Sequence, residues 1–97
     1  MAVETITIEK KSTATVRKPA PRYRVLLHND DVNSMEYVVE SLLEVVPSLT
    51  TPQAVDIMMQ AHTAGKAVVL FCALENAGFF CEGLNNRGLT SSFEPEG

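Results

Sequence analysis

The sequence has few of the residues on which catalytic and metal sites depend. Its 97 residues include two histidines and two cysteines, and none of these four stands close to another in the chain. This spacing gives no metal-binding cluster, and the chain also lacks a phosphate-binding glycine loop and a serine elbow. We therefore expect a protein that is not an enzyme and needs no metal or other cofactor. Cys72 and Cys81 are expected in the core, where small apolar thiols usually lie.

Long apolar segments are missing as well. No apolar run approaches the roughly 18 residues needed to cross a membrane, and residues 1–21 lack the apolar stretch and cleavage pattern of a signal peptide. The composition, 45% hydrophobic and 21% charged, is that of an ordinary globular protein. A chain of 97 residues has room for one hydrophobic core. We expect one domain in a reducing compartment, without a membrane partner.

Charge is divided unequally along the chain. Residues 1–22 carry five basic and two acidic side chains (+3), whereas residues 23–97 carry three basic and ten acidic ones (−7). An acidic body repels phosphate backbones and attracts cationic groups, so we expect no nucleic-acid partner. Threonine, lysine, alanine and proline dominate residues 1–21, which predicts a flexible amino-terminal extension followed by a folded domain over residues 22–97.

Three short segments have the composition of strands. Apolar and β-branched residues dominate 23–27 and 66–72, and residues 89–94 alternate as in a strand that is wet on one face. With three helices between these segments, the order is β-α-α-β-α-β. We expect an α/β (α+β) fold: a single small domain in which three helices pack on one face of a three-stranded antiparallel sheet.

Capping residues, proline and glycine mark the ends of the helices. Asn33, with Glu36 three residues later, predicts the N-cap and capping box of the first helix. The second helix is expected to begin at Thr51 and Pro52 and to end at Gly65. The third is expected over residues 74–86.

Polar residues gather in the loop after the first strand. Asn29, Asp30 and Asp31 follow that strand, and His62 lies near the end of the second helix. An Asn-Asp-Asp run is by itself turn and capping chemistry, and a histidine on a mostly apolar helix face is more often a core residue than a ligand. Methionines such as Met58 either pack in a core or line an adaptable binding surface. From these residues alone, both interpretations stay open.

Several segments match a known family when they are taken together. Residues 23–31 are YRVLLHNDD, residues 34–39 are SMEYVV, and His62 shortly precedes GKA at 65–67. These motifs resemble the ClpS adaptors of the N-end rule pathway. The most specific parts are the Asn-Asp-Asp loop followed by Met-Glu, and the histidine before Gly-Lys-Ala. The closing GLTSSFEP motif resembles the shorter forms found in cyanobacteria and plastids.

The resemblance implies a pocket that binds the first residue of a substrate protein. It assigns Asn29, Asp30 and His62 to the α-ammonium group, Asp31 and Asn33 to the peptide backbone, Met35, Val38, Met58, Ala61 and Leu89 to the apolar pocket, and Glu75 and Phe80 to unfoldase docking. Met35 stands where the family places a gate against β-branched side chains. An α-ammonium group presents three donors, so a carboxylate, an amide oxygen and a neutral imidazole make a suitable acceptor set.

Three positions depart from the family pattern. Ala61 replaces a larger β-branched residue of many relatives, which predicts a wider pocket. Asn33 and Ser34 replace a commoner Thr-Pro pair in the loop that aims Asp31. Phe80 stands where relatives often carry lysine on the docking helix.

The function implied by the resemblance is delivery of proteins for degradation. Such an adaptor recognises a free, bulky hydrophobic amino-terminal residue (an N-degron) and hands its bearer to the N-terminal domain of a ClpC- or ClpA-like AAA+ unfoldase. We expect a monomer in the cytoplasm or plastid stroma. One alternative is an interaction domain of ribosomal-stalk-like fold without amino-acid recognition, since fold does not fix function. Another is a hydrolase using His62 with Asp30 or Asp31, for which the sequence shows no evident nucleophile or oxyanion site.

Overall fold

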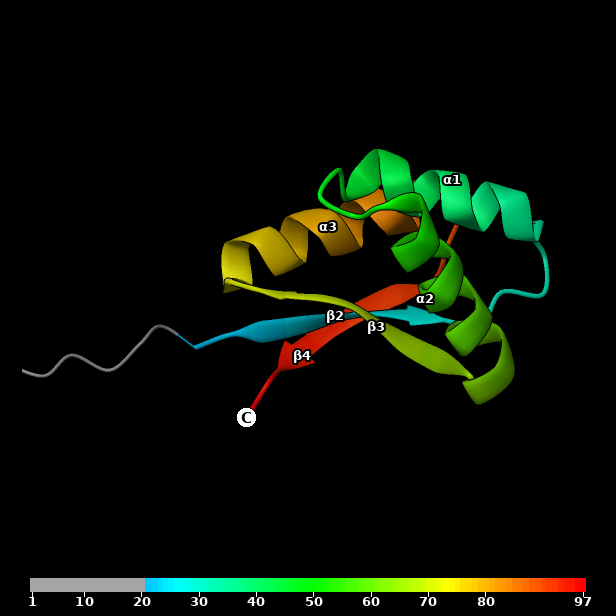
Figure 1. Cartoon of the computed structure of the whole chain (residues 1–97). Coiled ribbons are helices and arrows are strands. Elements are labelled where there is room, and N and C mark those ends of the chain that lie inside the picture. Colours follow the sequence, from blue (N-terminus) through cyan, green and yellow to red (C-terminus); the bar gives the residue numbers. More distant parts are fainter. Residues whose placement is uncertain (1–20) are drawn as a thin grey trace, which may run out of the picture.

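The computed structural model describes residues 21–97 (Figure 1). Its elements follow the order β2 (Tyr23–His28), α1 (Met35–Val45), α2 (Thr51–Ala64), β3 (Lys66–Cys72), α3 (Leu74–Asn86) and β4 (Ser91–Pro95). The three strands form one antiparallel sheet in the order β3-β2-β4. The expected order β-α-α-β-α-β and the expected fold class are therefore confirmed. The predicted flexible extension falls outside the described residues, apart from Pro21.

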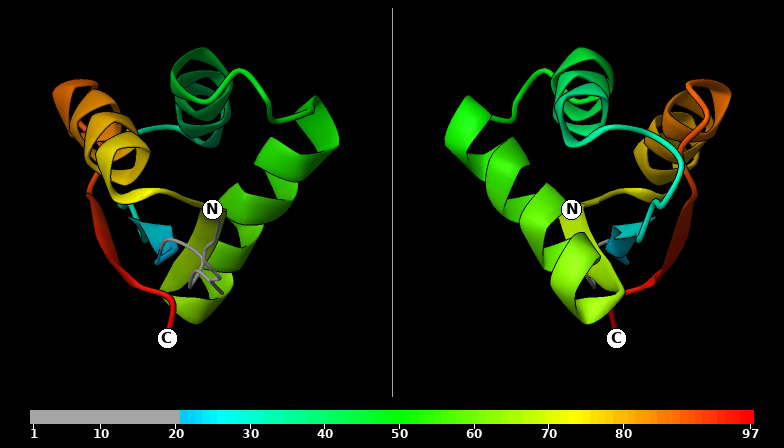
Figure 2. Two further views of the ribbon diagram at one scale, coloured as in Figure 1. Left: turned by 90° about the vertical axis from the view of Figure 1, so that its left-hand side faces the viewer. Right: turned by 90° about the vertical axis from the view of Figure 1, so that its right-hand side faces the viewer.

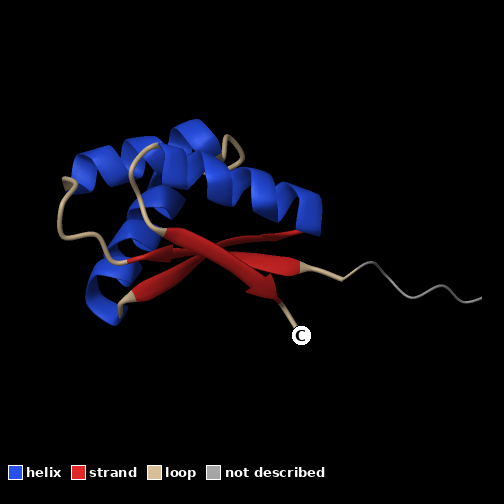
Figure 3. Ribbon diagram, turned by 180° about the vertical axis from the view of Figure 1, so that it is seen from behind, coloured by secondary structure: helices blue, strands red, loops and turns tan. Residues whose placement is uncertain are grey.

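The helices lie together on one side of the sheet (Figures 1 and 3). Seen along the sheet, α2 and α3 flank α1, which lies farthest from the strands (Figure 2). Accordingly α1 packs on α2 and α3, while those two helices pack on the sheet. The first helix thus forms the outer layer, and its partners are helices rather than strands.

One hydrophobic core joins the central strand to the helices. Val25 and Leu27 of β2 are almost fully buried, as are Leu42 of α1 and Leu84 of α3. Each buried leucine or valine side chain contributes about 1.5–3 kcal/mol relative to an exposed one. Cys81 is buried as expected, whereas Cys72 is half-buried at the edge of the core, where burial raises the pKa of its thiol.

The start of α1 differs from the sequence prediction. Its N-cap is Ser34, whose hydroxyl accepts a hydrogen bond from the backbone N–H of Tyr37 at 3.1 Å. Asn33 lies one residue before this cap, and its side-chain amide donates to Asp30 Oδ2 at 2.7 Å. The second helix has a complete capping box, although it is built by Thr50 and Gln53 just before and after the predicted start.

The third helix approaches α1 closely at a glycine. A Cβ atom added at Gly83 would lie 2.9 Å from Cγ1 of Val45, at the end of α1. Valine is stiff at χ1, so its methyl group has little room to move aside. At Gly78, one to two turns earlier, an added Cβ would meet nothing within 4 Å. Packing therefore requires glycine at one of these positions and not at the other.

This contrast predicts opposite effects of two similar substitutions. Gly78→Ala should raise the free energy of unfolding by about 0.5–1 kcal/mol, because alanine is the better helix former. Gly83→Ala should lower it, because the clash with Val45 outweighs the same gain in propensity. Urea unfolding of the two variants beside the unchanged chain measures both effects. Equal stabilisation by the two would show that α1 and α3 are not in close contact there.

Candidate functional site

A small pocket lies where the end of β2, the start of α1 and the end of α2 meet. Its free volume is about 20 Å³, and the residues that line it are Leu27, His28, Asn29, Asp30, Asn33, Met35, Val38, Met58, Ala61 and His62. Eight of these ten residues belong to the site implied by the family resemblance. Leu27 and His28 were not anticipated, although both directly precede the Asn-Asp-Asp loop. Asp31 and Leu89 do not line the pocket as it stands.

The carboxylate of Asp30 organises the loop at the mouth of the pocket. Oδ1 accepts hydrogen bonds from the backbone N–H groups of Val32 and Asn33, both at 2.8 Å, and Oδ2 accepts from the Asn33 side-chain amide. Burial alone would raise the pKa of Asp30, but these hydrogen bonds, with those from Asn33 first, lower it below its usual value. A carboxylate has about four acceptor positions. Three are used by the loop, and one remains on Oδ2.

Asn33 connects this loop to the segment before β4. Besides binding Asp30, its side-chain amide donates to the carbonyl oxygen of Gly88 at 3.2 Å. The Thr-Pro pair of many relatives has no amide side chain at this place. Here Asn33 therefore ties together two loops that are 55 residues apart in sequence.

Asn29 and Asp31 interact with each other at the surface. The side-chain amide of Asn29 donates to Asp31 Oδ1 at 3.1 Å, and both residues are exposed. This bond uses the nitrogen of Asn29 and leaves its side-chain oxygen available as an acceptor. Because Asp31 points this way, it lies beside the pocket rather than in its wall.

A backbone hydrogen bond sets the loop against the end of α2. The N–H of Asn29 donates to the carbonyl oxygen of Gly65 at 2.9 Å, directly after β2 and β3 pair through His28 and Lys66. Gly65 has a φ of 92°, a conformation that favours glycine. One turn before it, His62 is exposed, which excludes the alternative that it packs in the core. The turn at Gly65 brings His62 into the same pocket as Asn29.

The apolar wall of the pocket comes from facing positions of α1 and α2. Val38, Met58 and Ala61 are buried, whereas Met35 is 47% exposed at the first position of α1. Met59, the next residue after Met58, is 42% exposed and does not line this pocket. A volume of about 20 Å³ is close to that of one water-sized probe and far below that of a large side chain.

A separate exposed surface lies on α3. Glu75 and Phe80 were both expected to dock a partner, but they do not lie alike: Glu75 is exposed, whereas Phe80 packs against the core. The neighbouring Phe79 is 69% exposed and meets the Phe80 ring edge-on at 5.8 Å. Sequence spacing contained this signal, because residues four apart share a helix face and Phe79 is four residues after Glu75.

Known proteins resemble this chain over most of its length. The family model described as "ATP-dependent Clp protease adaptor protein ClpS" matches residues 18–92. The chain belongs to the ClpS family. It is accordingly a non-catalytic adaptor of the Clp protease, a class that works with Clp chaperones and their substrates.

Individual ClpS relatives cover from 80% to 99% of this chain. An ATP-dependent Clp protease adapter protein ClpS of Synechococcus elongatus is 64% identical over 99% of this chain and 99% of its own length. The chloroplastic adapter of Arabidopsis thaliana is 51% identical over 84% of this chain and 51% of its own length. A solved structure of Agrobacterium tumefaciens ClpS2 bound to L-phenylalaninamide has a TM-score of 0.75 and 30% sequence identity, covering 80% of this chain and all of that one.

Residues 21–97 contain neither a membrane-spanning helix nor a cluster of metal-binding side chains. Within that range, no helix has both the length and the apolar character required to cross a bilayer. The same residues contain no group of three or more histidine, cysteine, aspartate or glutamate side chains placed to hold a metal ion.

Proposed function

We propose that this adaptor binds the free amino-terminal residue of substrate proteins, with a preference for bulky hydrophobic side chains, and delivers those proteins to a Clp AAA+ unfoldase. The observation that carries the proposal is a pocket that joins polar acceptors to an apolar wall and has no lysine or arginine among its lining residues. The compound in the Agrobacterium structure supports it, because L-phenylalaninamide has a free α-amino group next to an aromatic side chain.

The α-ammonium group is assigned to Asn29, Asp30 and His62. Asp30 has one acceptor position left on Oδ2, Asn29 has its side-chain oxygen, and a neutral imidazole of His62 has one unprotonated nitrogen. All three residues line one pocket, so they can converge on the three N–H donors of a single cation. Each charge-assisted hydrogen bond contributes about 1.5–3 kcal/mol. Asp31 and Asn33, at the mouth, are assigned to the peptide backbone.

The first side chain is assigned to the space between Met35, Val38, Met58 and Ala61. Leu89 is included because it is buried in the same core cluster as the last three. A pocket of about 20 Å³ admits a large side chain only if its wall moves. The exposed, unbranched Met35 is the lining residue best able to do so, which makes it the proposed gate. Ala61 then leaves room for an aromatic ring.

Unfoldase docking is assigned to the exposed face of α3. Glu75 and Phe79 share that face. Phe80 packs against the core and contacts the Phe79 ring edge-on. The partner proposed is the N-terminal domain of a ClpC- or ClpA-like unfoldase, with the adaptor acting as a monomer in the cytoplasm or plastid stroma. An exposed aromatic beside a carboxylate fits an apolar pocket with a nearby cation.

Acetylation of the substrate's amino group tests the proposed function. A peptide that begins with phenylalanine should lose about 2–4 kcal/mol of binding free energy when it is acetylated, because the acceptors then face no cation. His62→Ala should weaken the free peptide less, and the two losses should not add, since both remove one interaction. Fluorescence anisotropy measures the four combinations.

The control for this test is Thr63→Ala. Thr63 neighbours His62, is exposed and donates its hydroxyl proton to its own helix, so its removal should leave both affinities unchanged. If the acetylated peptide bound as tightly as the free one, amino-terminus recognition would be wrong, and an interaction domain of ribosomal-stalk-like fold would explain the chain better.

The role of Met35 as a gate is tested by shortening its side chain. Met35→Ala should allow peptides beginning with isoleucine or valine to bind about tenfold more tightly or better, because it removes a clash near the first side chain. Met59→Ala is a matched control, since Met59 is equally exposed on α2 but does not line the pocket. If the Met35 variant still rejected isoleucine and valine, the assignment of Met35 as a gate would be wrong.

The proposed docking face on α3 is tested by removing its exposed aromatic ring. Phe79→Ala should weaken binding to the isolated N-terminal domain of the unfoldase about tenfold or more, while affinity for the peptide stays the same. Phe93→Ala, which removes an exposed aromatic from β4, serves as the control. Isothermal titration calorimetry measures the affinity. Comparable losses in the Phe79 and Phe93 variants would place docking elsewhere.

A further inference from the structure

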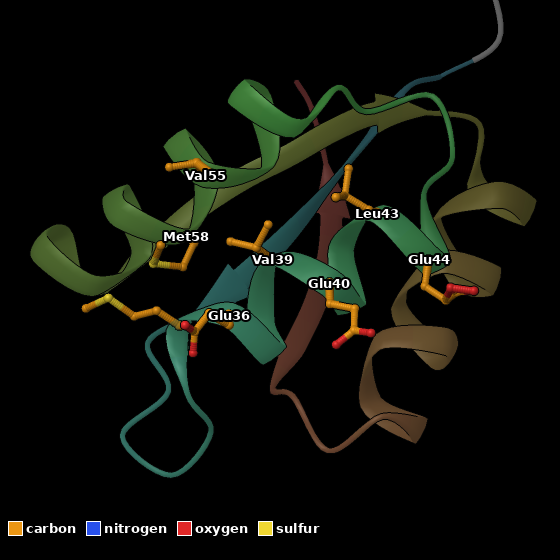
Figure 4. A pocket seen from close by; sticks show the side chains of 8 residues that line it. Glu36, Val39, Glu40, Leu43, Glu44, Val55 and Met58 are labelled. Carbon is orange, nitrogen blue, oxygen red and sulfur yellow. The ribbon is translucent and has the colours of Figure 1, made fainter.

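An apolar groove runs beside the pocket, between α1 and α2. Its volume is about 540 Å³, far larger than the pocket itself. Val39 and Leu43 of α1 face Val55 of α2 across it (Figure 4). Val55 is 38% exposed, and the other two are half-buried. The groove is thus an accessible apolar channel at the edge of the hydrophobic core.

The groove is continuous with the proposed amino-terminus pocket. Met35 and Met58 line both of them. A peptide whose first side chain enters past Met35 therefore emerges at the end of the groove. Any substrate protein must continue beyond its first residue, and the groove offers a path for that continuation.

Three carboxylates follow the α1 side of the groove. Glu36, Glu40 and Glu44 stand on successive helical turns, all exposed, and no basic residue lines the groove (Figure 4). Eight residues of helix rise about 12 Å, which an extended peptide covers in about four residues. The row of glutamates is therefore about as long as positions two to five of a bound, extended substrate.

We infer that this groove binds the residues that follow the substrate's first residue and selects segments that are apolar and positively charged. The inference rests on the proposed function and deepens it by defining a substrate class. A second copy of this chain is a poor occupant, because an isologous contact would bring two rows of glutamates together. A basic, extended peptide instead meets opposite charge at the rim of the groove, formed by Glu36, Glu40 and Glu44, and apolar surface between the helices.

Two peptides that differ only in charge test the groove. Phe-Lys-Leu-Lys-Leu-Gly and Phe-Glu-Leu-Glu-Leu-Gly, each with a carboxy-terminal fluorophore, are titrated with the full chain at low salt. We expect the lysine peptide to bind at least about tenfold more tightly, since attraction is replaced by repulsion at two positions. High salt should reduce this ratio.

Variants of the three rim glutamates show whether the preference for the lysine peptide arises at the groove. Glu40→Gln should reduce the ratio, and the triple variant Glu36→Gln, Glu40→Gln, Glu44→Gln should bring it below about threefold. Glu82→Gln removes the same charge from an exposed position of α3, outside the groove, and should leave the ratio unchanged. A ratio near one, or equal effects of the Glu40 and Glu82 variants, would overturn the inference. So would a gain in affinity for both peptides in the triple variant, which would assign the groove to the chain's own basic residues 1–20.

Acetylated forms of both peptides separate this inference from the proposed function. If acetylation abolished binding but the lysine and glutamate peptides bound equally well, the inference about the groove would be wrong and the proposed amino-terminus pocket would stand. Binding that survives acetylation with the ratio intact would overturn amino-terminus recognition and support the groove as a site of its own.

Discussion

The loop that carries the site depends on the carboxylate of Asp30. Two backbone N–H groups and one side-chain amide converge on it. Burial would raise the pKa of Asp30, but these hydrogen bonds outweigh burial and lower it. These bonds fix the course of the backbone over residues 30–33, because they tie Val32 and Asn33 to the Asp30 side chain. Asn33 extends the same network to the segment before β4. A single half-buried carboxylate thus fixes the mouth of the pocket before any ligand binds.

This arrangement makes a pocket that is ordered on its polar side and adaptable on its apolar side. The polar side is fixed by hydrogen bonds to Asp30 and by the Asn29 to Gly65 backbone contact. The apolar side ends at Met35, which has unbranched geometry and substantial exposure. Preorganised acceptors lower the cost of binding a cation, while a movable methionine lets the small cavity widen for a side chain.

Local sequence signals were sufficient for most elements. Residues 66–72 and 74–86 were predicted with the observed bounds, because Gly65 and the change of hydrophobic period mark them clearly. The N-cap of α1 was missed because Asn33, a good capping residue, is bound to Asp30 instead, which no local pattern shows. The pocket residues came from the family resemblance rather than from spacing. The groove between α1 and α2 depends on how two helices pack, so no single segment could predict it.

The most direct measurement is a residue-specific NMR titration of the full chain with L-phenylalaninamide and with its N-acetyl form. We expect the free amine to shift the resonances of the Asn29 side-chain amide, the His62 imidazole and the Met35 methyl group, while the resonances of α3 stay in place. The acetylated compound should produce little change at the same concentrations. Equal shifts with both compounds, or shifts confined to α3, would contradict binding of an α-ammonium group in this pocket.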